Sequence, residues 1–252
     1  MAKWGMVIDL DKCTGCQACT TACSMENTRL PGENWQDVLF YSEGEYPSAQ
    51  MSWFPRPCMH CENPSCVDVC PTKATYKDPD GGFVLIDWNK CIGCKYCMIA
   101  CPYGVRFYTD EKPLIEPDIK QVFKGAGGRS WNPPYKGPQD DPSRGIGVQP
   151  DGVVSKCTFC YHKVSKAPKG TPDLDEDNPA LKEFVPACVR TCAPKARYFG
   201  DLDNPASQVN KLIGDKRGKR LLDHTGNKPQ VYYLSGGAGA AVPSGRDTVN
   251  RV

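Results

Sequence analysis

Hydrophobic residues in this 252-residue chain occur in short runs rather than in long periodic stretches. Two of these runs, residues 6–8 and 84–86, each lead into a cysteine-rich segment. A short apolar run bounded by turn residues is consistent with a buried strand. The pattern predicts a strand, a loop and a short helix, and this unit occurs twice. The 24 glycines and 23 prolines indicate many turns and few long helices.

Two further stretches lack the pattern of a packed element. Residues 113–152 are rich in Gly and Pro and predict a connecting loop, and residues 235–252 predict an extended C-terminal tail. Residues 1–6 are too short for the apolar part of a signal peptide. Because no apolar run reaches the roughly 18 residues that a spanning helix needs, we expect no direct membrane span.

The charge balance excludes one class of partner. The formal net charge is +2 and the pI is about 7.8. Such a near-neutral chain has no electrostatic drive toward nucleic acid. We therefore expect no nucleic-acid partner.

The chemistry of the chain is concentrated in sixteen cysteines, which fall into four groups of four with none left over. A disulfide framework would normally accompany a secretory signal, so its absence favours metal. The groups are Cys13, Cys16, Cys19 and Cys23; Cys58, Cys61, Cys66 and Cys70; Cys91, Cys94, Cys97 and Cys101; and Cys157, Cys160, Cys188 and Cys192.

The first and third groups have the spacing C-x2-C-x2-C-x3-C, within VIDLDKCTGCQACTTAC and LIDWNKCIGCKYCMIAC. This is the bacterial ferredoxin run for [4Fe–4S] clusters, in which the fourth cysteine ligates the other cluster of a pair. Gly15 and Gly93 lie inside the loops, where a residue without Cβ bends easily. Zinc is the alternative, but three sulfurs so close together would leave one unused at a tetrahedral site. Four groups predict four [4Fe–4S] clusters in two ferredoxin-like units.

The other two groups carry a family resemblance. They read CMHCENPSCVDVCPTKA from residue 58, KCTFCYHK from residue 156 and VPACVRTCAPKARYFGDLDNP from residue 185. Together with GMVIDLDKCTGCQAC from residue 5, these motifs resemble the four-cluster iron–sulfur subunits of the molybdopterin oxidoreductase (DMSO reductase) superfamily. The resemblance is strongest to the subunits of polysulfide, thiosulfate, tetrathionate and arsenate reductases.

The resemblance implies an α+β fold and a pairing of groups. The first ferredoxin-like unit is expected at residues 1–52 and 153–234, and the second at residues 53–112. Each cluster then takes three cysteines from one group and the last cysteine of the paired group. The implied ligand sets are Cys13, Cys16, Cys19 and Cys192; Cys157, Cys160, Cys188 and Cys23; Cys58, Cys61, Cys66 and Cys101; and Cys91, Cys94, Cys97 and Cys70.

The resemblance also implies a function without a catalytic site in this chain. The chain would carry electrons between a molybdenum- or tungsten-pterin catalytic subunit and a membrane quinone-linked subunit or a soluble carrier. A free-standing polyferredoxin is the alternative, and a zinc-stapled scaffold is a third hypothesis. Location stays open between the cytoplasm and export in folded form with a partner that bears a twin-arginine signal.

Two kinds of residue near the cysteines have several possible roles. His60 and His162 each lie near a C-x2-C pair, but full cysteine sets favour a supporting role over iron ligation. Lys12, Lys90 and Lys156 each directly precede the first cysteine of a group. They are either solvated or placed to tune a cluster by their charge.

Overall fold

The computed structural model describes residues 2–27, 34–108, 141–147, 149–214 and 218–235. Most of the predicted connecting loop, and all but the first residue of the predicted tail, lie outside the described residues. Among the residues that are described, no helix is long and apolar enough to cross a membrane.

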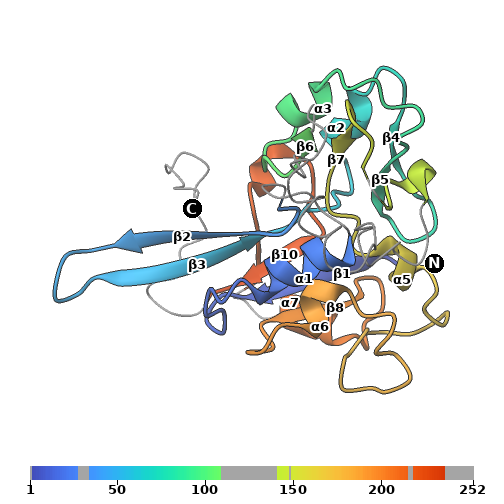
Figure 1. Ribbon diagram of the computed structural model, residues 1–252. Coiled ribbons are helices and arrows are strands. Elements are labelled where there is room, and N and C mark those ends of the chain that lie inside the picture. The colour runs from blue at the N-terminus through green and yellow to red at the C-terminus, as the bar shows by residue number, and fades with distance from the viewer. Residues whose placement is uncertain (1, 28–33, 109–140, 148, 215–217, 236–252) are drawn as a thin grey trace, which may run out of the picture.

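A four-stranded sheet joins the start of the chain to its end (Figure 1). Its central strand β1 (Trp4–Asp9) pairs in parallel with β10 (Val231–Leu234) and antiparallel with β8 (Arg197–Asp201). Strand β9 (Gly218–Arg220) extends the sheet beyond β10. All six residues of β1 are buried, because α7 (Gln208–Gly214) packs on the sheet and the cysteine loops cover the rest. A strand buried on both faces is apolar throughout rather than alternating.

The other helices are short, as the Gly and Pro content predicts. The first cysteine group lies in and before α1 (Ala18–Glu26), which packs against α6 (Ala187–Arg190) of the fourth group. In the same way α2 (Ser65–Asp68) packs against α3 (Tyr96–Ile99), which carry cysteines of the second and third groups. Helix α5 (Tyr161–Val164) follows Cys160, and η1 (Pro142–Arg144) and η2 (Asp223–Thr225) are single 3-10 turns.

Strand pairing repeats the same plan in the two halves of the chain. Strand β4 (Thr75–Lys77) follows the second group and pairs antiparallel with β5 (Val84–Ile86), which precedes the third. Strand β8 follows the fourth group and pairs antiparallel with β1, which precedes the first. The structure is therefore internally duplicated, and each half contains one copy of the repeated sequence unit.

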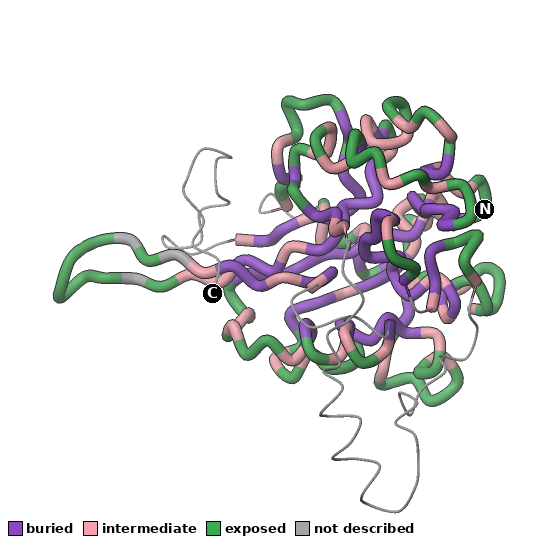
Figure 2. The backbone as a smooth tube through the Cα atoms, turned by 45° about the horizontal axis from the view of Figure 1, so that its top comes forward, coloured by how far each residue is buried: buried purple, intermediate pink, exposed green. Residues whose placement is uncertain are grey.

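The connections between the halves repeat as well. Strands β2 (Asp37–Glu43) and β3 (Gln50–Arg56) form a hairpin between the first and second groups. Strands β6 (Phe107–Tyr108) and β7 (Val154–Ser155) form the equivalent ladder between the third and fourth groups. The β2–β3 hairpin reaches far out of the body (Figure 1), and its tip at residues 44–49 is exposed (Figure 2).

Aromatic side chains fill the centre, where the two halves meet. Trp4 stacks on Phe199 with ring centroids 5.6 Å apart, and Phe199 meets Phe159 edge to face at 5.3 Å. Phe159 in turn stacks on His60 at 3.9 Å. The expectation of an α+β fold with short strands and short helices is confirmed in these elements. The stretches at residues 6–8 and 84–86 lie in β1 and β5 as predicted.

Candidate metal centres

All sixteen cysteines lie in the described residues, and none of them forms a disulfide. They are placed where strands end and short helices begin. Burial divides them: Cys16 and Cys94 are exposed, whereas the first three cysteines of the fourth group are buried. Each sequence repeat thus has one exposed thiol, whereas the fourth group has none.

One cavity is lined by cysteines of two different groups. Cys58, Cys61 and Cys66 come from the second group, and Cys101 is the last cysteine of the third. Burial raises the pKa of Cys61 to about 12, and the neighbouring Cys58 and Cys66 add to the effect. Thiolates that repel one another in a buried pocket need a cation to hold them. A metal cluster satisfies that need.

A second cavity has the same composition in the other half of the molecule. It is lined by Cys13, Cys16 and Cys19 of the first group and by Cys192, the last cysteine of the fourth. In both cavities the chain therefore brings three cysteines of one loop toward the last cysteine of another. This is the arrangement that the resemblance implies.

Some of the remaining cysteines also lie near cysteines of another group. Burial raises the pKa of Cys97, and Cys91 and Cys70 raise it further, so these three thiols are neighbours. The fourth group meets the first through Asn27, whose Nδ2 lies 3.5 Å from the Sγ of Cys23. Burial raises the pKa of Cys160, which a hydrogen bond from the same Asn27 side chain opposes. The Asn27 side chain thus lies beside both Cys23 and Cys160.

The sulfur atoms surround cavities rather than a single point. Within the part of the chain that the structure describes, no group of three or more His, Cys, Asp or Glu side chains is arranged to hold one metal ion. A cubane spreads its four thiolate ligands over separate irons, whereas zinc draws them onto one ion. The residues present therefore fit a cluster better than they fit zinc.

Backbone conformation shapes each cysteine loop. Gly15 and Gly93 both have φ of +66°, a left-handed conformation that Gly adopts without strain. Gln17 and Lys95, immediately before α1 and α3, are left-handed as well. The two sequence repeats therefore fold into the same loop, as their shared spacing predicts.

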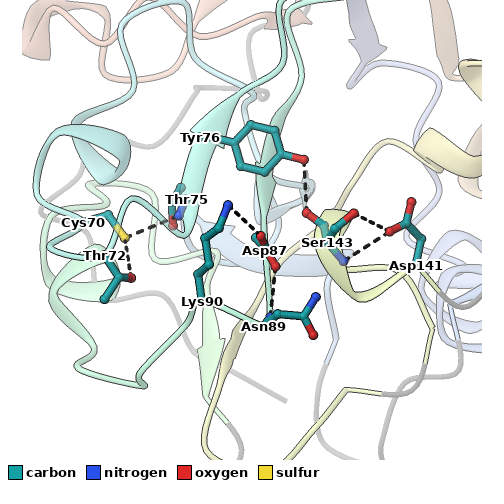
Figure 3. A network of polar contacts seen from close by, with 9 residues as sticks. All are labelled: Cys70, Thr72, Thr75, Tyr76, Asp87, Asn89, Lys90, Asp141 and Ser143. Carbon is teal, nitrogen blue, oxygen red and sulfur yellow. Dashed lines mark hydrogen bonds and ion pairs between the residues drawn. The ribbon is translucent and has the colours of Figure 1, made fainter.

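Backbone N–H groups point at several of the sulfurs. The amide of Thr75 lies 3.4 Å from the Sγ of Cys70 (Figure 3), and that of Ala196 lies 3.3 Å from the Sγ of Cys192. Burial would raise the pKa of Cys70, but the hydrogen bonds from Thr75 and Thr72 lower it overall. Such donors stabilise a thiolate and tune the metal that it binds.

The aspartate shared by the two repeats has a structural role. The Oδ1 of Asp9 accepts from the amide of Asp11 at 3.1 Å, and the Oδ1 of Asp87 accepts from the amide of Asn89 at 3.0 Å. Both aspartates are buried, and Figure 3 shows Asp87 between Asn89 and Lys90. Each one fixes the turn that carries the chain from strand to cysteine loop.

The lysines that precede the groups have different surroundings. The ammonium of Lys12 donates to the hydroxyl of Tyr198 at 2.5 Å, and Lys90 pairs with Asp87 at 3.1 Å near the surface. Lys156 is only 2% exposed, and its Nζ donates to the carbonyl of Cys157 at 2.8 Å. Only Lys156 of these three is placed inside the protein between cysteine groups.

The two histidines take supporting positions. His60 is fully buried and hydrogen-bonds to the backbone of Val84 and of Cys157. His162 is buried too, and its Nε2 lies 2.9 Å from the Oε1 of Glu26. Each ring nitrogen that hydrogen-bonds here does so to a backbone group or a carboxylate, in agreement with a role beside the cysteines.

Two buried arginines were missed by the sequence analysis. Arg106 and Arg197 are each 5% exposed, and each lines one of the two cavities. Both follow the last cysteine of their group by five residues, in CPYGVR and CAPKAR. The equal five-residue offset could have pointed to these arginines in the sequence. Because arginine is so often exposed, the offset alone did not identify them as buried.

Known proteins match this chain over most of its length. Two family models match, each described as a 4Fe-4S dicluster domain, at residues 12–74 and 49–117. The iron–sulfur cluster-binding subunit of menaquinone reductase from Nitratidesulfovibrio vulgaris is 40% identical, over 92% of this chain and 89% of the relative. A selenate reductase subunit from Mesobacillus selenatarsenatis is 38% identical, over 92% of this chain and 72% of the relative.

A third relative is the iron–sulfur subunit of arsenate respiratory reductase from Shewanella sp., which is 36% identical over 92% of this chain and 96% of the relative. Matches of this identity and coverage favour an electron-transfer subunit over the free-standing polyferredoxin. The chain belongs to the family of [4Fe–4S] electron-transfer subunits of molybdopterin oxidoreductase complexes.

Proposed function

We propose that the chain holds four [4Fe–4S] clusters with crossed ligation between cysteine groups. The two lined cavities and the neighbours of Cys97 and Cys160 support this proposal. The ligand sets are Cys13, Cys16, Cys19 and Cys192; Cys157, Cys160, Cys188 and Cys23; Cys58, Cys61, Cys66 and Cys101; and Cys91, Cys94, Cys97 and Cys70. Residues 1–52 with 153–234 form one ferredoxin-like unit and residues 53–112 form the other, with the β2–β3 hairpin shared between them.

The proposed clusters form a line whose order follows from burial. Burial raises the pKa of Cys157 to about 12, and the next contribution comes from Cys58 of the other unit. The Cys157 and Cys58 sets are therefore neighbours at the centre. The sets of Cys13 and Cys91 include the exposed Cys16 and Cys94, so they lie at the two ends. Each cubane, when bound, takes up or releases one electron.

The protein's own residues position the proposed clusters and control their surroundings. The cysteines fix the positions of the clusters, and the aromatic centre around Phe159 and His60 excludes water from the inner pair. Backbone amides such as that of Thr75 stabilise charge on the sulfurs. Electrons enter at one exposed end and leave at the other, and the substrate reacts in a partner subunit.

The partners follow from the two ends. One end faces a molybdenum- or tungsten-pterin catalytic subunit, and the other faces a membrane quinone-linked subunit or a soluble carrier. The family assignment supports this placement, since a relative at 40% identity is a subunit of a menaquinone reductase.

Purification under native conditions tests the assembly. A chain of 27.7 kDa that works as a subunit should elute from size exclusion in a much larger complex and co-purify with a pterin-containing subunit. Elution of all of the chain as a stable, brown, 27.7 kDa species would instead support a free carrier. Iron and acid-labile sulfide of about sixteen each per chain, without a [3Fe–4S] EPR signal, test the cluster content.

A further inference from the structure

Arg106 and Arg197 occupy equivalent places in the duplicated fold. Each is 5% exposed and each follows the last cysteine of its group by five residues. Arg197 begins β8, and Arg106 lies directly before β6. A guanidinium remains charged even when buried, so each position places a permanent positive charge inside the protein.

Arg197 contacts one cysteine set of the first unit and interacts electrostatically with the other. Its Nη2 lies 3.5 Å from the Sγ of Cys19, and it lines the cavity of that set. Burial alone would lower the pKa of Arg197, yet Cys19, Cys188 and Cys192 hold it above its usual value. Cys188 belongs to the second ligand set of this unit, so the charge acts on both.

Arg106 stands in the same relation to the second unit. It lines the cavity of Cys58, Cys61, Cys66 and Cys101. Its Nη1 donates at 3.3 Å to the Oγ1 of Thr75, the residue whose amide points at Cys70 of the neighbouring set. Its Nη2 is buried without a hydrogen-bond partner among the described residues. Cys66 and Cys97, one from each set, both raise the pKa of Arg106 and so favour its charged form.

Neither guanidinium is neutralised by a carboxylate in the contacts described. The hydrogen-bond acceptors of Arg197 are the Oε1 of Gln36 at 3.0 Å and the sulfurs of Met6 and Cys19. The oxygen acceptor of Arg106 is the hydroxyl of Thr75. A buried charge that lacks a counter-ion is costly, so each arginine depends on negative charge from the cysteine sets that flank it.

We propose that Arg106 and Arg197 each raise the reduction potentials of the two [4Fe–4S] clusters between which they lie. This inference rests on the proposed ligand sets. Reduction adds one negative charge to a cluster, and a cation buried beside it stabilises the reduced form. One shared cation acts on both clusters of a unit. It therefore shifts the two potentials in the same direction.

Neutral substitutions test the proposal in the holo complex. Arg106→Gln should shift the midpoint potentials of two clusters to lower values, and Arg197→Gln should shift those of the other two. Arg106→Lys and Arg197→Lys keep the charge and should stay near the wild type. The readout is an anaerobic redox titration followed by EPR, with iron and sulfide counted in every sample.

Arg190→Gln is the matched control. Arg190 lies in α6 between Cys188 and Cys192 but is exposed to solvent. The substitution removes the same charge two residues from Cys188 and Cys192, and water should screen its effect. An equal shift in this variant, or an equal shift of all four potentials in either buried variant, would overturn the proposal. So would unchanged potentials in Arg→Gln proteins that keep all their iron.

If Arg197→Gln loses iron, Gln36→Glu tests the role of the charge instead. The new carboxylate would lie beside Arg197 and neutralise it in place. If Arg197 has only a structural role, the new ion pair should hold it more firmly and leave the reduction potentials of the first unit unaltered. That result would contradict the proposal. A role through charge requires that both potentials of the first unit fall. Fewer than four clusters in the wild type would instead refute the ligand sets.

Discussion

His60 hydrogen-bonds through its Nε2 to the carbonyl oxygen of Cys157 at 3.0 Å, across the junction of the two halves. Its Nδ1 accepts from the amide of Val84 in β5 at 3.0 Å. Because a backbone amide only donates, Nδ1 is unprotonated, and Nε2 must be the donor to Cys157. A neutral histidine thereby ties the second unit to the loop of the fourth cysteine group.

His60→Phe tests this tie. Phenylalanine keeps the stack on Phe159 but leaves the buried amide of Val84 without its acceptor. The free energy of unfolding should fall by about 1–3 kcal/mol. Thermal unfolding followed by visible absorbance measures it. His224→Phe is the control, since His224 is exposed; equal stability of both variants would show that the His60 hydrogen bonds do not matter.

Glu26 joins the end of α1 to α5. Its carboxylate lies 2.9 Å from His162 and 2.7 Å from Lys163. Burial would raise its pKa, but hydrogen bonds from His162 and Lys163 lower it to about 2. A carboxyl whose pKa is lower in the folded state stabilises the protein above its unfolded pKa, here about 4.5, and this contribution is lost as the pH falls toward 2.

Glu26→Gln should therefore destabilise the protein most at neutral pH. We expect the free energy of unfolding to fall by about 1–2 kcal/mol at pH 7, a value that allows for solvent screening. The difference from the wild type should shrink as the pH falls below about 4.5. Denaturant midpoints measured in anaerobic protein at several pH values give the comparison. Glu45→Gln at the exposed hairpin tip is the control, and a pH-independent difference in Glu26→Gln would count against the ion pair.

The glycines of the two loops differ in how tightly they are enclosed. A Cβ on Gly93 would lie 2.2 Å from the backbone oxygen of Gly152, whereas one on Gly15 would meet the movable side chain of Trp53 at the same distance. Both also need a left-handed backbone. Gly93→Ala should therefore disturb its loop more than Gly15→Ala does.

Iron analysis checks that difference. Gly93→Ala should fall from about sixteen toward about twelve irons per chain through loss of one cluster, and Gly15→Ala should lose less. Gly214→Ala is the control, because its Cβ would meet nothing within 4 Å. Full iron in Gly93→Ala would mean that the loop adapts to a side chain.

The sequence predicted the cysteine loops and the strands that lead into them. The cysteine spacing indicated the loops, and the repeat of Ile-Asp and Lys-Cys indicated two equivalent strands, found as β1 and β5. The β2–β3 hairpin and β10 were not predicted. Strand β10 pairs with β1, which lies more than 200 residues earlier, and no local pattern reveals such a partner.

The two buried arginines were the other omission. An arginine is nearly always exposed, so its type argues against the buried positions that Arg106 and Arg197 take. Only the folded chain shows that sulfurs from separate loops surround them. The equal offset of the two arginines from a cysteine becomes meaningful once the duplication of the fold is known.

Crossed ligation is the central claim, and iron positions in a structure of the holo protein test it most directly. An anomalous difference map at the iron edge should show four clusters. The Sγ of Cys192 should lie about 2.3 Å, a typical metal–thiolate distance, from the cluster that Cys13, Cys16 and Cys19 bind. The Sγ of Cys101 should bind the cluster of Cys58. If Cys23 instead binds the same cluster as Cys13, the paired arrangement is wrong.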